Sequence, residues 1–314
     1  MPAETALPET ALAETALAET VERRPSWIRT RFRASARYRG VIDLLREHDL
    51  NTVCEEAACP NIGECFGAGT ATFMILGDIC TRACGFCAVT SGRPAGLDLG
   101  EPSRLAAAIA ALELDHAVIT SVNRDDLPDG GAGMFAACIR AIRERLPACT
   151  VEVLVPDFEG NWKALAVVME AGPAVLNHNV ETVPRLYPRV RPKAQYARSL
   201  ELISRATSLA PATPTKSGLM VGLGESFEEL VEVMSDLRSA GCELLTVGQY
   251  LRPSLKHLPI ARYYEPSEFE ALAAAGRALG FAHVEAGPLV RSSYRASEQA
   301  RAATARMARR RFDG

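Results

Sequence analysis

The sequence lacks any uninterrupted apolar run long enough to cross a bilayer, and it lacks the basic stretch and apolar core of a secretory signal at its N-terminus. It also lacks a large basic block, and its formal net charge is -3. These absences predict no membrane span, no nucleic-acid partner held by phosphate contacts, and a cytoplasmic location. We interpret the locally basic C-terminus as a solvated tail; its arginines are Arg301, Arg306, Arg309, Arg310 and Arg311.

Cysteine, in contrast, is plentiful, with nine residues in a chain of 314. A reducing compartment keeps thiols reduced, so this number favours metal binding over disulfides. Six of the nine lie within residues 54–87, where they form two triplets. The other three, Cys138, Cys149 and Cys242, are scattered, and we predict that they are small core residues.

The chain divides into four expected parts. Residues 1–20 repeat a five-residue unit whose leucines do not keep to one helix face, which predicts a flexible, dispensable tail; an arm that docks on a partner is the alternative. Residues 21–69 are expected to form an extension that carries one cysteine triplet. Residues 70–281 are expected to form the main domain, and residues 282–314 a closing segment with the basic tail.

Strand-like and helical runs alternate through the main domain. Six apolar runs are predicted to be buried strands, at residues 72–76, 117–120, 151–155, 174–176, 218–221 and 244–247. Between them lie amphipathic helices, one of which has Ser226 as a predicted N-cap and Glu229 three residues on. This alternation predicts an α/β fold with parallel strands. Six units are fewer than the eight of a closed barrel, so we expect an open (β/α)6 TIM-type barrel with its chemistry at the C-terminal strand ends.

The triplet Cys80, Cys84 and Cys87 has C-x3-C-x2-C spacing and follows the first predicted strand. Three thiolates this close can bind three irons of a four-iron cube and leave the fourth iron open to a ligand. Structural zinc is the main competitor, but its sites usually use four ligands in paired C-x2-C steps. Buried free thiols are the remaining alternative.

The second triplet, Cys54, Cys59 and Cys65, has C-x4-C-x5-C spacing and precedes the barrel. Two triplets imply two cubes, each of which is one protein ligand short.

The two triplets together resemble the lipoyl synthases of the radical S-adenosylmethionine (SAM) superfamily. Phe86, directly before Cys87, is typical of that superfamily. The resemblance continues through residues 53–57, 59–62, 124–131, 178–182 and 287–294, and it spans about residues 25–297. It implies two 4Fe-4S clusters and bound SAM.

The resemblance also implies a reaction. An electron enters the first cluster, SAM splits into methionine and a 5′-deoxyadenosyl radical, and that radical removes hydrogen from an octanoyl chain linked to a lysine. Sulfur from the auxiliary cluster is then inserted at C6 and C8. The implied partners are octanoylated carrier domains (2-oxoacid dehydrogenase E2 and the glycine cleavage H protein) and a low-potential electron donor such as ferredoxin or flavodoxin.

The resemblance assigns roles to individual residues. Cys80, Cys84 and Cys87 hold the SAM-binding cluster, while Cys54, Cys59 and Cys65 hold the auxiliary one. In the family a serine of the block at residues 291–294 ligates the auxiliary cluster, and the match selects Ser293, with Ser292 as the alternative. The oxygen of a serine is a harder ligand than thiolate, so this corner of the cluster would be released more easily.

Several polar residues follow predicted strands and are candidates for SAM binding. Thr120 and Asn123 are expected to point into the barrel mouth. Asn177, Asn179 and Glu181 could hold the ribose or the methionyl group, whereas His178 is either a ligand or a satisfied core residue. The block at residues 218–225, which includes Gly222, resembles the superfamily's adenine-binding strand, and Tyr250 could meet the adenine edge through its backbone.

Two rival functions are weighed against this interpretation. A methylthiotransferase acting on RNA or protein would be favoured by an added RNA-binding domain, which the sequence does not show. A two-cluster electron-transfer protein would need four cysteines per cluster and no cofactor pocket.

Overall fold

The computed structural model describes residues 24–29, 34–67 and 71–312, so the repeat at residues 1–20 lies outside the described residues. The centre of the molecule is an eight-stranded sheet with the order β1-β2-β5-β6-β7-β8-β9-β10. Its strands are β1 (Asn51–Thr52), β2 (Thr72–Ile75), β5 (His116–Ser121), β6 (Thr150–Leu154), β7 (Val175–Asn177), β8 (Thr215–Val221), β9 (Leu244–Gln249) and β10 (His283–Gly287).

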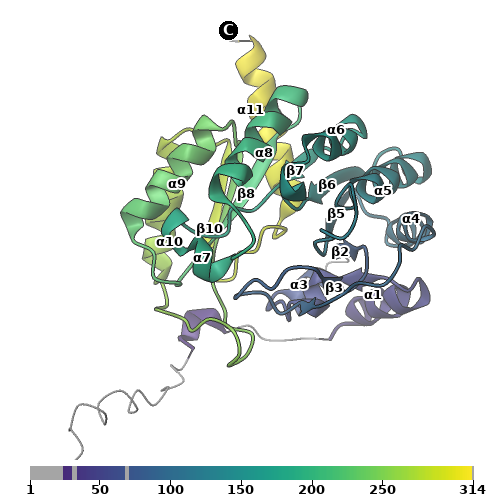
Figure 1. The fold of residues 1–314 in the computed structure, drawn as a ribbon, viewed down its shortest axis with the longest axis horizontal. Coiled ribbons are helices and arrows are strands. Elements are labelled where there is room, and N and C mark those ends of the chain that lie inside the picture. The colour runs from purple at the N-terminus through teal and green to yellow at the C-terminus, as the bar shows by residue number, and fades with distance from the viewer. Residues whose placement is uncertain (1–23, 30–33, 68–70, 313–314) are drawn as a thin grey trace, which may run out of the picture.

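Neighbouring strands from β2 to β10 are all parallel, and a helix connects each of them to the next (Figure 1). The connecting helices are α4 (Glu101–Ala111), α5 (Ala132–Arg145), α6 (Trp162–Glu170), α8 (Tyr196–Leu209), α9 (Phe227–Ser239) and α10 (Pro266–Ala278). The predicted capping box at Ser226 and Glu229 is confirmed at the start of α9. No helix among the described residues is both long enough and apolar enough to span a membrane.

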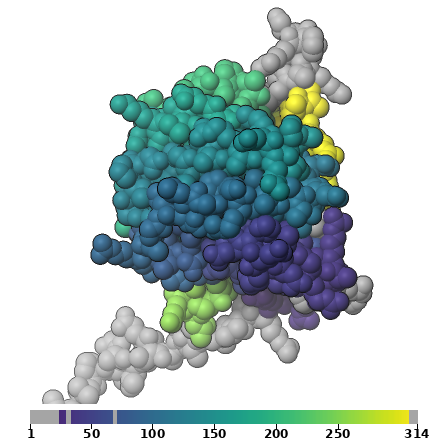
Figure 2. Space-filling view, turned by 90° about the vertical axis from the view of Figure 1, so that its right-hand side faces the viewer, coloured from purple at the N-terminus to yellow at the C-terminus, as the bar shows by residue number. Residues whose placement is uncertain are grey.

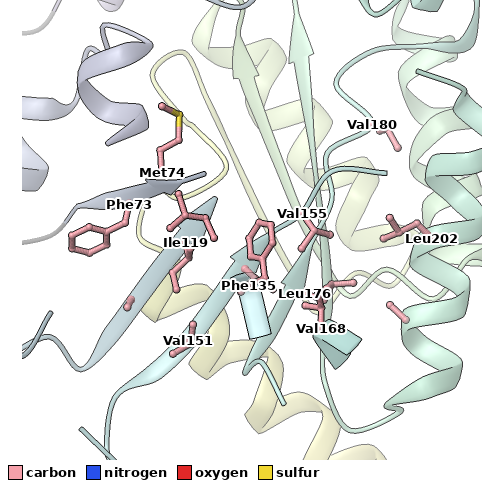
Figure 3. Packing of buried hydrophobic residues seen from close by; sticks show 14 of the residues in the cluster. Phe73, Met74, Ile119, Phe135, Val151, Val155, Val168, Leu176, Val180 and Leu202 are labelled. Atoms are coloured by element: carbon pink, nitrogen blue, oxygen red, sulfur yellow. The ribbon is translucent and has the colours of Figure 1, made fainter. Parts of the chain in front are cut away.

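The core lies between the sheet and its helices. All residues of β2 and β9 are buried, as expected for parallel strands that are covered on both faces. Figure 3 shows Phe135 of α5 in this core together with Ile119 of β5 and Val151 of β6. Cys138, Cys149 and Cys242 are buried, and they belong to this core.

The predicted fold class is confirmed, and each of the six predicted strands is observed. A seventh parallel strand, β10, extends the barrel beyond six units. Among the described residues no strand pairing joins β10 to β1 or β2, so the barrel is open. After β10 the chain enters α11 (Ala296–Phe312), which contacts both β5 and β10 and packs its buried Ala303 against Val175 and Leu244, the first residues of β7 and β9.

The N-terminal extension packs on the open edge at β2. It contains α1 (Ala36–Glu47), β1, α2 (Val53–Glu56) and α3 (Ile62–Gly67), and β1 pairs with β2 in antiparallel fashion. The rings of Tyr38 and Phe66 lie 5.5 Å apart and join α1 to α3. Figure 2 shows this purple extension seated directly against the blue first units of the barrel. The second cysteine triplet is therefore held beside the barrel rather than on a separate arm.

Candidate functional site

The first cysteine triplet lies on the loop after β2, which includes the short strands β3 (Ile79–Cys80) and β4 (Thr90–Ser91). Three other loops hold its backbone. The Thr81 N–H donates to the Asn123 carbonyl at 3.0 Å, and the Gly85 N–H donates to the Val190 carbonyl at 3.0 Å. His257 Nε2 donates to the Cys87 carbonyl at 3.0 Å. The three thiols are therefore placed by loops that follow β5, β7 and β9.

Arg82 fixes this loop from within. Its side chain is buried, with Nε 2.8 Å from Asp125 and Nη2 2.6 Å from Asp157. Burial alone would raise the pKa of Asp157, but the Arg82 guanidinium holds that pKa at about 2. Both carboxylates follow barrel strands, so the ion pairs lock the cysteine loop onto the C-terminal edge of the sheet.

A cavity of about 490 Å³ opens at this edge of the barrel. The three cysteines of the first triplet line it, and so do five of the seven predicted SAM-binding residues: Thr120, Asn123, Asn179, Glu181 and Tyr250. The structure thus brings together residues from the ends of four different strands, β2, β5, β7 and β9, as the barrel fold predicts.

Asn177 and Gly222 do not line this cavity. Asn177 lies one layer deeper, and its Nδ2 donates to Glu152 at 3.3 Å. Gly222 adopts a φ of 101°, and a side chain there would collide with Gln249. Its N–H donates to Glu225 Oε1 at 2.6 Å, so Gly222 forms the turn after β8.

His178 touches the cavity, but both of its ring nitrogens are already bonded. Nδ1 lies 2.8 Å from the Val155 carbonyl, and Nε2 lies 2.9 Å from Ser199 Oγ. Since a carbonyl can only accept, Nδ1 carries the proton and Nε2 accepts from the serine hydroxyl. Burial lowers the pKa of His178 to about 4, so the ring is neutral. The structure therefore favours the satisfied core residue.

Four buried polar atoms on the cavity wall have no partner among the described residues. They belong to Ser121, Asn123, Asn179 and Arg191. Buried polar atoms in folded proteins are nearly always hydrogen-bonded, so these atoms point to a polar ligand in the cavity. The amino-acid and ribose groups of SAM offer the donors and acceptors that such a wall requires.

Glu181 and Arg191 form a buried charged group beside the thiols. Arg191 Nη1 donates to the Asn179 carbonyl at 2.8 Å, and Asn179 Nδ2 donates to Glu181 Oε1 at 3.0 Å. Burial raises the pKa of Glu181, although Arg191 and Asn179 oppose that rise. Glu181 also has a φ of 66°, which is uncommon for a residue with a side chain. Such strained backbone is often found at ligand sites.

The second triplet lies around α2 and the start of α3, and the segment after β10 packs directly against it. Asn61 Nδ2 donates to the Leu289 carbonyl at 2.7 Å, and the Thr72 hydroxyl donates to Ser293 Oγ at 2.8 Å. Thr72 also hydrogen-bonds to Cys54. Ser293 therefore lies next to the second triplet, whereas Ser292 lines the central cavity.

The same cavity reaches both triplets. Its wall opposite the cysteine loop includes Val53 and Pro60, the neighbours of Cys54 and Cys59. Arg291 lines the space between them, close to both Cys59 and Glu181. Sequence reasoning did not single out Arg191 or Arg291, because an arginine next to a proline or in a polar turn gives no signal of a buried site.

The donor set fits iron–sulfur clusters better than a single ion. Among the residues that the structure describes, no three Cys, His, Asp or Glu side chains converge as ligands of one metal ion do. A four-iron cube binds each thiolate at a separate iron, so its ligands stand further apart. Cys80 Sγ also accepts from the Arg82 and Asn123 N–H groups at 3.4 and 3.3 Å, and such bonds tune cluster potentials. Burial raises the pKa of Cys54 and Cys87 to about 12, so metal binding must displace their protons.

Comparisons with known proteins agree with this geometry. The model of the Radical SAM superfamily matches residues 74–237. Lipoyl synthase from Rubrobacter xylanophilus is 59% identical over 276 residues, which cover 88% of this chain and 86% of that protein. Lipoyl synthase from Methylococcus capsulatus is 60% identical over 279 residues, which cover 88% and 87% of the two chains.

Solved structures support the fold. The hydrogenase maturase HydG aligns with a TM-score of 0.53 at 15% identity over 77% of this chain and 62% of its own. Streptococcus suis SuiB bound to its precursor peptide SuiA aligns with a TM-score of 0.54 at 10% identity over 79% and 52%. At these identities the likeness concerns the barrel alone. The close sequence relatives and the matching family model show that this chain belongs to the lipoyl synthase family within the Radical SAM superfamily.

Proposed function

We propose that this chain inserts sulfur at C6 and C8 of an octanoyl chain carried on a protein lysine. In this proposal Cys80, Cys84 and Cys87 hold the SAM-binding 4Fe-4S cluster, while Cys54, Cys59, Cys65 and Ser293 hold the auxiliary one. The main support for the proposed reaction is that one cavity is bounded by the first triplet on one side and by the neighbours of the second triplet on the other. A reaction that uses both clusters on one substrate needs such a shared space.

When bound, SAM and the two clusters supply a radical that can attack an unactivated C–H bond and the sulfur that replaces the hydrogen. The protein itself positions the cluster ligands. Asn123 and Arg82 direct N–H groups at Cys80 Sγ, which orients that thiolate and stabilises its charge. Their own positions depend on the Arg82 ion pairs with Asp125 and Asp157.

Asn179, Glu181 and Arg191 are the best-placed residues for the polar part of SAM. Each lines the cavity, and Asn179 and Arg191 retain a buried polar atom without a partner among the described residues. Thr120 of β5 and Tyr250, directly after β9, also line the cavity and are proposed to border the nucleoside. The Thr120 hydroxyl already donates to the Leu154 carbonyl at 3.1 Å, which fixes its direction.

The remaining wall suits an alkyl chain. Met74, Val122, Leu154, Leu219 and Met220 contribute apolar side chains to the lining. An apolar wall excludes water from the reacting carbons and holds them against the radical source.

The partners and the part boundaries belong to this proposal as well. Octanoylated carrier domains of 2-oxoacid dehydrogenase E2 and the glycine cleavage H protein are the proposed substrates, and ferredoxin or flavodoxin is the proposed donor. We place the auxiliary-cluster extension at residues 21–69, the barrel at 70–281 and the closing segment at 282–314. A cytoplasmic location remains a prediction from the sequence.

The function is tested on the anaerobically reconstituted protein with reductant, SAM and an octanoyl-lysyl peptide. Mass spectrometry should find two sulfur atoms in the peptide and 5′-deoxyadenosine in the supernatant. A peptide that stays unmodified while 5′-deoxyadenosine forms would exclude octanoyl-lysine as the substrate. Electron paramagnetic resonance spectra with and without SAM should differ, since SAM perturbs only a cluster with an open iron.

A further inference from the structure

Three of the four segments around the first triplet contain no acidic residue; the fourth, the loop after β5, has Asp125 and Asp126, which are ion-paired with Arg82 and Arg124. Residues 79–97, 182–200 and 244–264 contain no Asp or Glu, although the whole chain has a net charge of -3. The first two segments follow β2 and β7, the third comprises β9 and the loop after it, and hydrogen bonds join them at the cysteine loop. Gly85 donates to the Val190 carbonyl and accepts from the Leu258 N–H, both at 3.0 Å. The segments therefore form one continuous surface.

Three exposed cations stand on this surface, and each lies close to a backbone contact of the cysteine loop. Lys193 Nζ donates to the Thr81 carbonyl at 3.1 Å. Arg189 precedes Val190, and Lys256 precedes His257, which donates to the Cys87 carbonyl. No carboxylate among the described residues forms an ion pair with any of the three. We call Arg189, Lys193 and Lys256 the basic face.

The basic face also carries an exposed apolar side chain. Leu255, next to Lys256, is 66% exposed. The loop that contains it, light green in Figures 1 and 2, projects from the end of the barrel. An exposed apolar residue next to a cation is suited to a protein partner with a negative surface, because the cations steer the encounter and the apolar contact adds burial.

The surface around the second triplet carries negative charge instead. Glu55, Glu56 and Glu64 lie between or beside Cys54, Cys59 and Cys65. Glu55 is paired with Arg46 at 2.7 Å, whereas Glu64 is exposed and meets only the Tyr294 hydroxyl among the contacts that the structure describes. A negatively charged partner is thus attracted to the first triplet and repelled from the second.

We propose that the basic face is the docking site for an acidic one-electron carrier protein that reduces the first cluster. The inference rests on the proposed function, which requires an electron at that cluster. On docking, one electron passes from the reduced carrier to the cluster, and no bond or proton is exchanged. The exposed Ala83, beside Cys84, lies on the same loop as the cluster ligands, so a docked carrier reaches the cluster by the shortest route.

The test compares two charge reversals of equal size. The double variant Arg189→Glu with Lys256→Glu alters the basic face. The control, Arg145→Glu with Arg277→Glu, alters exposed arginines near the carboxyl ends of α5 and α10, at the opposite end of the barrel. Iron content and thermal unfolding should match the wild type in both.

Binding is measured by calorimetry, with the reconstituted protein and an oxidised, strongly acidic flavodoxin at about 50 and 200 mM salt. The basic-face variant should bind at least about tenfold more weakly at low salt, and the control should bind like wild type. With reduced flavodoxin, 5′-deoxyadenosine should form about tenfold more slowly in the basic-face variant. With reduced methyl viologen, a small cation that needs no docking site, the two variants and wild type should turn over equally.

Equal flavodoxin affinity for both variants would overturn the proposal. Weaker binding of an octanoylated carrier domain with unchanged flavodoxin binding would assign the face to the substrate instead, and a preference for single-stranded RNA would assign it to nucleic acid. Failure of the wild type with methyl viologen would count against the proposed function rather than against the docking site.

Discussion

The Thr72 hydroxyl donates a 2.8 Å hydrogen bond to Ser293 Oγ, which joins the first barrel strand to a segment 221 residues later in the chain. Thr72 also contacts Cys54, so one threonine holds the serine and a cysteine of the proposed auxiliary site at the same place. Ser292 points elsewhere and lines the central cavity. The two serines are adjacent in sequence but face different parts of the site.

Because the two serines face different parts of the site, their substitutions should have different effects. Ser293→Ala should retain SAM cleavage, because the first triplet is untouched, and should lose most sulfur insertion. Ser292→Ala should be milder. The assays are 5′-deoxyadenosine by chromatography and peptide mass. Loss of sulfur insertion in Ser292→Ala alone would reassign the ligand to Ser292.

Gly218 in β8 and Gly222 in the turn after it provide a second contrast. A Cβ at Gly218 would lie 2.7 Å from Asn179 Oδ1 and 2.9 Å from Thr246 Oγ1, in the cavity wall. Gly218→Ala should therefore weaken SAM binding by about tenfold, equivalent to about 1.4 kcal/mol, with little change in the unfolding temperature. Equilibrium dialysis with labelled SAM gives the affinity.

Gly222→Ala is the matched variant, and we expect it to lower the stability of the fold rather than to act directly on SAM binding. Its φ of 101° and the contact with Gln249 make any side chain there strained. We expect a loss of at least about 1 kcal/mol in the free energy of unfolding, measured with urea. A stable Gly222→Ala protein that has lost SAM binding would restore the original prediction for Gly222.

The sequence predicted the strands of the barrel better than it predicted which residues line the cavity. The apolar runs predicted all six strands because a strand buried on both faces must be apolar throughout. β10 was missed because its five residues are only half-buried and include just one β-branched residue. Asn177 was predicted to reach SAM but lies one layer below the cavity. The extended backbone continues past β7 until Glu181 pairs with Leu219, so the residues that face the cavity come later in the chain. Spacing along the chain identified the cysteines, but which layer of the barrel faces the cavity depends on strand stagger, which the sequence does not reveal.

Asn177 belongs to a buried charged cluster below the cavity. Lys216 Nζ lies 3.0 Å from Glu152 Oε1, and both side chains are fully buried. Burial would raise the pKa of Glu152, but Lys216 and His116 hold it below its usual range. Lys216→Met leaves the buried Glu152 carboxylate without its lysine cation and should cost about 3 kcal/mol or more. Adding Glu152→Leu should recover most of that loss, and urea unfolding of both variants measures it. A double variant no more stable than Lys216→Met would show that the pair does not act as a unit.

His178 predicts a pH dependence of stability. Its pKa is lowered from 6.5 to about 4 by burial, so the unfolded chain binds a proton in the window between these values and the folded chain does not. The contribution of His178 to the free energy of unfolding is therefore complete above about pH 6.5 and is lost as the pH falls towards 4. The stability advantage of wild type over His178→Gln should shrink by about 2 kcal/mol between pH 7 and pH 5. Urea unfolding of the cluster-free proteins at both pH values measures it, and a constant difference would mean that His178 titrates normally.

The two triplets should be separable by function. Cys84→Ala removes a thiolate from the cavity wall beside Glu181 and Arg191, where SAM is proposed to bind. That variant should form no 5′-deoxyadenosine and insert no sulfur. Cys59→Ala alters only the extension, which packs on β2 and makes none of the backbone contacts that hold the cysteine loop. It should still cleave SAM but add no sulfur.

Iron content provides an independent measurement of the same separation. Reconstituted wild type should hold about eight irons from two four-iron cubes, and replacement of Cys54, Cys59 and Cys65 together should leave about half. Wild type should also stop after about one product per chain if the auxiliary cluster is consumed as the sulfur source. Sulfur insertion by Cys59→Ala at the wild-type level would refute the auxiliary assignment, because no other cysteine among the described residues of the extension could replace it.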